Sequence, residues 1–172
     1  MQYKIVFFDY WHISSGVSAG PALDSTVVKS KEDIPYVPGK TIKGLLSEMT
    51  YLLDPSKIES IFGAEGSQMG EAFFSNATLD TQTSEHLKQN PHLTRHLYSK
   101  ISSTKIDSDG IAQDKSLREI EVVVPLMLRG SIECKEEDEM LLVQAMGMVK
   151  QMGLNRNRGL GRCSITKDNH DS

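Results

Sequence analysis

Residues 23–44 read LDSTVVKSKEDIPYVPGKTIKG, and the rest of the chain is interpreted around this stretch. Its end, Pro38-Gly39-Lys40-Thr41, runs into apolar residues at helical spacing, which predict an amphipathic helix over residues 41–53. Gly39 allows the backbone to approach a ligand closely, and Thr41 is a residue type that caps helices. The stretch therefore predicts a loop that enters a helix at a binding site.

The predicted start of this helix suits a phosphate group. The open amides of a first helical turn attract anions, and Lys40 and Lys43 lie beside them in the sequence. Asp24 places one carboxylate a short loop away. A nucleotide-binding P-loop is the rival interpretation, but it requires a glycine five positions before Gly39, where this chain has Ile34. An ordinary loop and helix cap is the plainer alternative.

The hydrophobic pattern predicts an α+β fold. Its order of strand, helix, strand, insertion, strand, helix, strand is that of a ferredoxin-like (RRM-like) βαββαβ sheet with two helices on one side. We expect a single domain over residues 1–172, in which the polar residues 80–119 form an inserted, thumb-like lobe with a hairpin that turns near residues 107–110. The predicted strands are residues 3–11, 71–79, 120–134 and 162–167, and the second helix is residues 136–152.

Composition indicates a soluble protein of the cytoplasm. The 172 residues carry a net charge of −4, no apolar run approaches the length of a membrane span, and only Cys134 and Cys163 could form a disulfide. The charge is unevenly distributed, because residues 87–105 contain cations and no acid. A protein with segregated charge can bind a polyanion at one face despite its negative total.

A second cationic stretch lies near the C-terminus. Residues 153–162 read GLNRNRGLGR, with three arginines and no acid. Glycines allow consecutive amides to point at an anion, and arginine binds phosphate through two parallel hydrogen bonds. The pattern favours gripping of a nucleic-acid backbone over reading of bases. A helix C-cap followed by a solvated turn is the alternative.

Several other polar residues are of types that carry chemistry. His12 could act as a general base, although packing at the end of a strand or contact with RNA fits it better because no partner is evident. His92 and His96 have the spacing of a metal-binding pair on a helix, but no further ligand completes a zinc site. Asp107 and Asp109 start like a calcium loop whose later ligands are missing, which favours a turn.

Four pieces of the sequence together resemble the RAMP superfamily. They are WHISSG after the first strand, LDSTVV followed by IPYVPGKTIKG, IFGAEG leading into AFFSNATL, and GLNRNRGLGRC. The chain is most similar to the guide-RNA-binding backbone ribonuclease subunit of type III (Csm/Cmr) CRISPR effector complexes. The resemblance is weakest over residues 80–118, so it implies a thumb there without assigning roles to its individual residues.

The resemblance implies that Asp24 cleaves complementary target RNA with a divalent metal, Mg²⁺ or Mn²⁺, which it would bind. It also implies a guide (CRISPR) RNA, other effector subunits, and copies of the chain in a head-to-tail filament as partners. The cationic start of the first helix, residues 39–43, and the Gly/Arg stretch, residues 153–162, are expected to converge on one RNA backbone. The residues expected to contact RNA are His12, Lys40, Thr41, Lys43, Asn155, Arg156, Arg158, Gly159 and Gly161.

Three alternatives remain open. The chain could be a guide-RNA-binding scaffold of the same family without nuclease activity. It could be a single-copy guide-processing endoribonuclease that uses a histidine. An unrelated small ferredoxin-like enzyme is the last possibility, and failure to co-purify with RNA would favour it.

Overall fold

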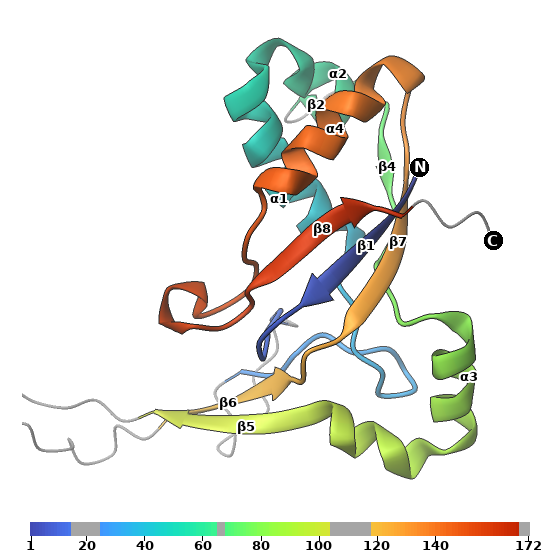
Figure 1. Cartoon of the computed structure of the whole chain (residues 1–172), viewed down its shortest axis with the longest axis vertical. Helices are drawn as coiled ribbons and strands as arrows, with labels where there is room; N and C mark the ends of the chain where they lie inside the picture. The colour runs from blue at the N-terminus through green and yellow to red at the C-terminus, as the bar shows by residue number, and fades with distance from the viewer. Residues whose placement is uncertain (15–24, 65–67, 104–117, 169–172) are drawn as a thin grey trace, which may run out of the picture.

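The computed structural model describes residues 1–14, 25–64, 68–103 and 118–168. Four strands form the main sheet, in the order β4-β7-β1-β8: β4 (Phe73–Phe74), β7 (Met127–Glu133), β1 (Gln2–Phe7) and β8 (Cys163–Lys167). Each neighbouring pair is antiparallel. This α+β arrangement, shown in Figure 1, is the ferredoxin-like order expected from the sequence.

Alternation of side chains along the strands defines the core. In β1, Tyr3, Ile5 and Phe7 are buried, whereas Lys4 and Val6 between them are partly exposed. The register aligns Ile5 with Leu128 of β7 and with Ile165 of β8, so one apolar row crosses three strands. That row gives the sheet a single fully buried face.

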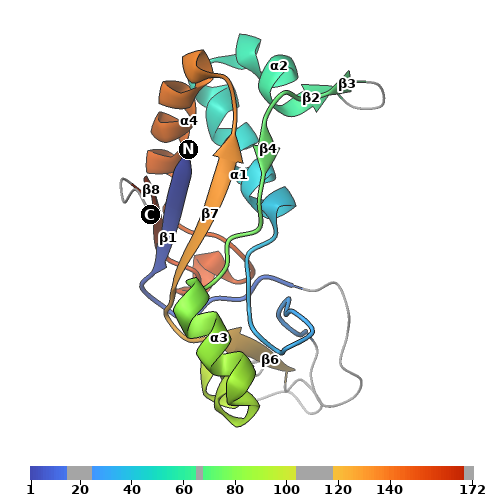
Figure 2. The same cartoon turned by 90° about the vertical axis from the view of Figure 1, so that its right-hand side faces the viewer.

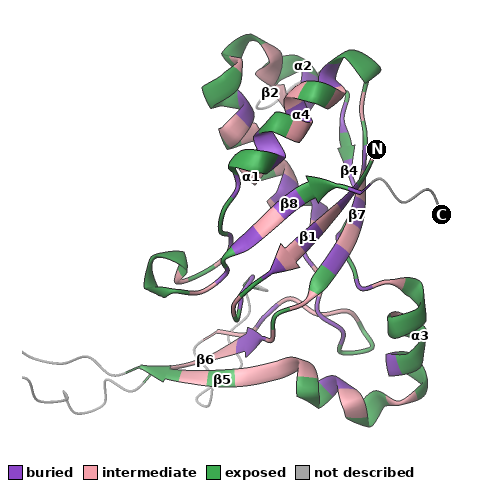
Figure 3. Ribbon diagram, in the orientation of Figure 1, coloured by how far each residue is buried: buried purple, intermediate pink, exposed green. Residues whose placement is uncertain are grey.

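Two helices, α1 (Gly39–Leu53) and α4 (Glu136–Met148), pack against each other over this buried face (Figures 2 and 3). Ile42 and Leu46 are the fully buried residues of the α1 stripe, and Leu142 and Met146 are their counterparts on α4. Beyond α1 come the short helices η2 (Pro55–Lys57) and α2 (Ile58–Phe62), followed by the small hairpin β2 (Gly63–Ala64) and β3 (Gln68–Met69).

Helix α4 ends four residues earlier than the sequence predicted. Residue Val149 has an extended backbone, and the following residues pair with the chain that enters β8: Gln151 bridges Arg162, and Met152 N–H donates to Gly161 O at 3.0 Å. The last turn of the predicted helix is thus replaced by strand-like pairing.

The prediction of one strand over residues 120–134 was wrong. The chain forms β6 (Arg118–Val123) and β7, which are separated by a bend at Pro125. Proline has no N–H to donate to a sheet ladder, so pairing breaks there. As a result β6 pairs with β5 (Tyr98–Ser103) in a separate two-stranded sheet, while β7 joins the main sheet.

The polar lobe contains more regular structure than its sequence suggested. It begins with α3 (Thr81–Gln89) and η3 (Pro91–Leu97), which lead into the β5–β6 hairpin (Figure 1). The predicted turn of this hairpin, residues 107–110, lies outside the described residues. The predicted strand over residues 71–79 is reduced to β4 and two isolated bridges, Val37–Ala77 and Thr78–Arg129.

In the part of the chain that the structure describes, no helix is long and apolar enough to cross a membrane.

Candidate nucleic-acid interface

The first turn of α1 packs tightly against the β4 edge of the sheet. A Cβ atom on Gly39 would collide with the backbone carbonyl of Phe74, so glycine is required here for close packing of helix on strand. The Gly39 N–H donates to Asn76 Oδ1 at 2.9 Å. Asn76 therefore caps the helix from across the fold, and Thr41, which lies within the first turn, does not.

Few amides of this turn remain open to a ligand. Besides Gly39, both Thr41 and Ile42 donate their N–H groups to Pro38 O, at 2.9 and 3.3 Å. The open-amide cradle predicted from the sequence is therefore largely closed by internal hydrogen bonds. Anion binding at this end of α1 depends on the side chains of Lys40 and Lys43.

These two lysines border a hollow that we call the α1 groove. It measures about 680 Å³ and lies between the start of α1, the β2–β3 hairpin and β4. Among the described residues neither ammonium group forms an ion pair, and Lys40 is exposed. Glu71 is the one acid among the described lining residues, and Lys135 neutralises it at 2.7 Å. The described lining of the groove is thus net cationic.

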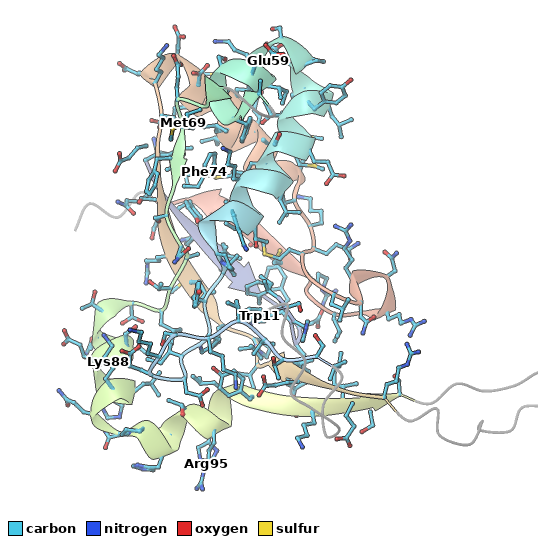
Figure 4. All side chains as sticks on the ribbon, turned by 180° about the vertical axis from the view of Figure 1, so that it is seen from behind. Trp11, Glu59, Met69, Phe74, Lys88 and Arg95 are labelled. Atoms are coloured by element: carbon cyan, nitrogen blue, oxygen red, sulfur yellow. The ribbon has the colours of Figure 1, made fainter. Side chains whose placement is uncertain are left out.

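Two large apolar side chains also face the α1 groove. Met69 is 95% exposed and Phe73 is 64% exposed, although Phe74 beside it is buried in the core. Figure 4 shows Met69 and Phe74 on the side of the molecule that carries α1. An exposed aromatic ring beside lysines offers base stacking together with positive charge. Proteins that bind single-stranded nucleic acids use this combination.

The second cationic stretch, residues 153–162, forms the Gly/Arg loop between α4 and β8. Leu154 N–H donates to His12 O and Gly161 N–H donates to Tyr10 O, both at 2.8 Å. Gly153 has a φ of 93°, and a Cβ there would collide with His12 O. The ends of the loop are therefore anchored on residues 10–12.

Between these anchors, Arg156 and Arg158 stand in a short 3₁₀ turn, η4 (Arg156–Arg158). Both are exposed, and neither guanidinium pairs with an acid among the described residues. Gly159 is also exposed, in a left-handed conformation that ends the turn. Gly161 is buried, with the Met152 carbonyl where its Cβ would lie, so it serves packing and presents no surface to a ligand.

A smaller hollow of about 240 Å³, the hairpin slot, separates the Gly/Arg loop from the β5–β6 hairpin. It is lined by Ile101, Ser103, Ile120, Asn155, Arg158 and Leu160. The slot brings two segments together that are far apart in the sequence. Nothing in the sequence predicted this contact.

The two cationic segments do not share one pocket. The start of α1 lies against β4 at one edge of the sheet, and the Gly/Arg loop leads into β8 at the other edge, with β7 and β1 between them (Figure 1). The α1 groove contains no residue of the loop, and the hairpin slot contains no residue of α1. A ligand that touches both must be extended, as a strand of RNA is.

His12 is fully buried. Its Nδ1 lies 2.6 Å from Glu121 O and its Nε2 lies 2.9 Å from Ser25 Oγ. Both ring nitrogens are therefore engaged inside the protein. This favours the packing interpretation of His12 over contact with RNA or general-base chemistry.

The sequence profile of the RAMP superfamily matches residues 4–164. The chain belongs to the RAMP superfamily. Among curated proteins no significant match to the chain was found.

This RAMP protein is similar in structure to subunits of two cryo-EM structures of the type III-B Cmr-beta complex. One is bound to cognate target RNA: its chain superposes with a TM-score of 0.73 at 10% identity, over 96% of this chain and 95% of that chain. The other is the apo state, with a TM-score of 0.73 at 12% identity over 95% of each chain. At such low identity the likeness establishes a shared fold.

Asp24, the predicted catalytic and metal-binding residue, lies outside the described residues, as do Asp107 and Asp109. Its neighbour Ser25 is described and is bonded to His12. His92 and His96 are both exposed on η3, and no group of three or more His, Cys, Asp or Glu side chains in the described part of this RAMP protein could hold a metal ion.

Sequence reasoning missed the apolar residues at both hollows. Phe73 lies in the strand predicted over residues 71–79, in which alternation turns Phe74 inward and Phe73 outward. That alternation is the signal that could have identified Phe73. Ile101 and Ile120 could not have been found in this way, since their pairing depends on where the hairpin turns.

Proposed function

We propose that this RAMP protein is a backbone subunit of a type III CRISPR effector, which binds guide RNA and cleaves complementary target RNA through Asp24. The observation that carries the RNA-binding part is the pair of cationic segments, each of which borders a hollow. Their Lys40, Lys43, Arg156 and Arg158 side chains form no ion pair with a described acid, whereas Arg162 pairs with Asp9 at 3.0 Å. Family membership and the fold shared with Cmr-beta subunits support the wider assignment.

Backbone gripping follows from the chemistry of the exposed groups. Lys40 and Lys43 supply point charges beside the α1 groove, and Arg156 and Arg158 supply planar guanidinium groups that bind phosphate oxygens through paired hydrogen bonds. None of these contacts depends on base identity. Such a surface suits a guide whose sequence varies, because base pairing and not the protein then selects the target.

In this proposal Asp24 promotes cleavage within the target strand. The 2′-oxygen of a ribose attacks the adjacent phosphorus, the bond from phosphorus to the 5′-oxygen breaks, and the departing oxygen takes up a proton. The carboxylate of Asp24 orients the linkage or accepts the proton of the attacking hydroxyl. Since RNA carries its own nucleophile, one well-placed carboxylate is a sufficient contribution from the protein.

A divalent cation fits this scheme with Asp24 as its protein ligand. Mg²⁺ is commonly bound by one or two carboxylates together with substrate phosphates, so Asp24 could hold it without the further protein ligands that are missing from the described residues. When bound, such an ion neutralises charge that develops on the phosphate.

The proposal extends to partners and location. Copies of the chain would stack head to tail along one guide, beside other effector subunits, in the cytoplasm. One of the similar Cmr-beta structures is bound to cognate target RNA, which supports RNA as the ligand of this chain.

The experiment that tests cleavage compares Asp24→Ala with Glu32→Ala in the assembled complex with Mg²⁺ or Mn²⁺. Glu32 is an exposed acid in the same stretch, and it serves as the matched control. We expect Asp24→Ala to abolish cleavage while guide binding persists, and Glu32→Ala to cut normally. Unchanged cleavage rate and product spacing in Asp24→Ala would refute the catalytic role.

The same assay separates the alternatives. A silent scaffold assembles normally and the wild type cuts nothing with either metal. A histidine-dependent guide-processing enzyme requires an accessible imidazole, and the burial of His12 argues against it.

A further inference from the structure

Part of the lining of the α1 groove is a rigid aromatic surface. Phe62 and Phe74 both line the groove, and their rings stack with centroids 5.6 Å apart and planes 16° from parallel. Both residues are buried, as is Ala72, which also lines the groove. This part of the lining is therefore apolar and is held in place by the packing of the core.

Two exposed apolar side chains complete the apolar part of the lining. Phe73 is 64% exposed and Met69 is 95% exposed, and both belong to the groove. Apolar surface left in water at one place costs free energy, so it indicates a ligand that covers it. Phenylalanine offers a flat ring for stacking, and the unbranched methionine side chain adapts to the shape of a ligand.

The groove also attracts an anion. Lys40 and Lys43 line it from the start of α1, and neither ammonium group pairs with a described acid. Glu71 does not cancel these charges, because Lys135 holds its carboxylate at 2.7 Å. The described lining thus combines an exposed aromatic ring with two cations.

The volume of the groove sets the size of its ligand. About 680 Å³ lies within the range of roughly 300–1,000 Å³ that small-molecule sites occupy. A purely apolar molecule would leave the two lysines without a partner, and an inorganic anion would leave the aromatic ring in water. A nucleotide joins a flat base to a phosphate through a ribose, so it matches both parts of the lining.

We propose that the α1 groove is a nucleotide-binding site. The base stacks on Phe73 beside Met69, and the phosphate binds the two lysines. The groove lies against β4, at the opposite edge of the main sheet from β8, and no residue of the Gly/Arg loop or of the β5–β6 hairpin lines it. A free nucleotide and a nucleotide of single-stranded RNA share this chemistry. RNA as the source rests on the proposed function, whereas the site itself does not.

Methyl NMR of the full chain, isotopically labelled at its methionine methyl groups, tests the site directly because Met69 lies in it. The ligands are adenosine 5′-monophosphate (AMP), adenosine, ribose 5-phosphate and single-stranded oligoadenosine RNA. The ring current of a bound base should shift the Met69 methyl signal upfield, whereas ribose 5-phosphate, which has no base, should not. Met140 is 74% exposed on α4 outside the groove, and its signal should stay in place.

Variants separate stacking from charge. Titration of the Met69 signal should give AMP a dissociation constant at least about fivefold weaker in Phe73→Ala, from the typical contribution of one stacked base. Phe8→Ala removes another exposed phenylalanine, which is outside the groove, and should leave AMP binding unchanged. The wild type should bind AMP more tightly than adenosine, and Lys40→Ala with Lys43→Ala should abolish this difference.

The oligoadenosine identifies the source of the nucleotide. Shifts of Met69 by AMP and by the RNA, both weakened in Phe73→Ala, would support the site. Tighter binding of the RNA than of AMP would assign the site to an RNA strand, and equal binding would assign it to a free nucleotide.

Two further results differ in what they overturn. If the RNA binds but neither it nor AMP shifts Met69, or if the shift is the same in Phe73→Ala, the groove is not a nucleotide site and the proposed RNA binding stands. If AMP shifts Met69 but the RNA does not bind anywhere at low salt, the proposed function fails and the nucleotide site stands.

Discussion

His12 Nε2 lies 2.9 Å from the hydroxyl of Ser25, the residue that follows Asp24 in the chain. The other ring nitrogen, Nδ1, lies 2.6 Å from the carbonyl of Glu121 and must donate to it, because a carbonyl only accepts. In a neutral ring Nε2 then accepts the Ser25 hydroxyl hydrogen. The histidine thus ties the residue next to Asp24 to strand β6.

Replacing His12 should therefore destabilise the fold. His12→Ala leaves a cavity and removes two buried hydrogen bonds, and we expect a loss of about 2–4 kcal/mol in the free energy of unfolding. Ser25→Ala removes only the hydroxyl and should cost about 1 kcal/mol. Urea denaturation measures both values, and an unchanged midpoint in His12→Ala would contradict the anchoring role.

The glycines of α1 provide a matched pair for a second prediction. Gly39→Ala forces a methyl group against the Phe74 carbonyl and should destabilise the protein by roughly 1–3 kcal/mol. A Cβ on Gly44, in the same helix, meets nothing within 4 Å, so Gly44→Ala should stabilise by about 0.5–1 kcal/mol. Thermal unfolding of the two variants should shift in opposite directions, and equal shifts would show that the start of α1 is not packed as described.

A third prediction concerns Asp80, the N-cap of α3. Its carboxylate accepts a hydrogen bond from Thr83 N–H at 2.9 Å, and this bond lowers the pKa of Asp80 below its usual value. Because the folded pKa lies below the unfolded one, the stabilisation is present above the unfolded pKa and is lost as pH falls through the folded pKa.

Asp80→Ala should consequently cost about 1 kcal/mol at pH 7. The gap to wild type should narrow below about pH 4, where aspartate becomes protonated. Urea titrations at neutral and acidic pH measure this gap. Glu85→Ala, an exposed change in the body of the same helix, should show no such narrowing. A gap that stays constant to low pH would exclude the charged cap.

The sequence predicted the main sheet because its strands alternate clearly. Tyr3, Ile5 and Phe7 recur at every second position, and tertiary contacts did not override that signal. The strand predicted over residues 120–134 breaks at Pro125, and the sequence does not reveal that the two halves of that run pair with different partners. Helix α3 was missed because its stripe contains one buried residue, Leu87, although Asp80 was an available capping signal.

For the candidate site, the sequence identified the charged residues but not the residues that surround them in the fold. Lys40, Arg156 and Arg158 are exposed, and Lys43 is half-buried at the border of the α1 groove. The role of Gly39 was misjudged, because its close neighbour is the Phe74 backbone and not a ligand. Such close approaches depend on tertiary packing, which no local pattern contains.

The most direct test of the central claim is the salt dependence of RNA affinity. Each lost phosphate contact lowers the slope of log affinity against log salt concentration by about 0.7 for a single strand. Two double variants each remove two predicted phosphate contacts: Lys40→Ala with Lys43→Ala, and Arg156→Ala with Arg158→Ala. Each double variant should reduce the slope by about 1.4 on every RNA sequence, and the four changes together should reduce it by about 2.8. The control pair is Lys31→Ala with Lys88→Ala, two exposed cations outside both segments. Slopes no lower than those of the control, or a loss confined to one RNA sequence, would contradict binding of one RNA backbone by both segments.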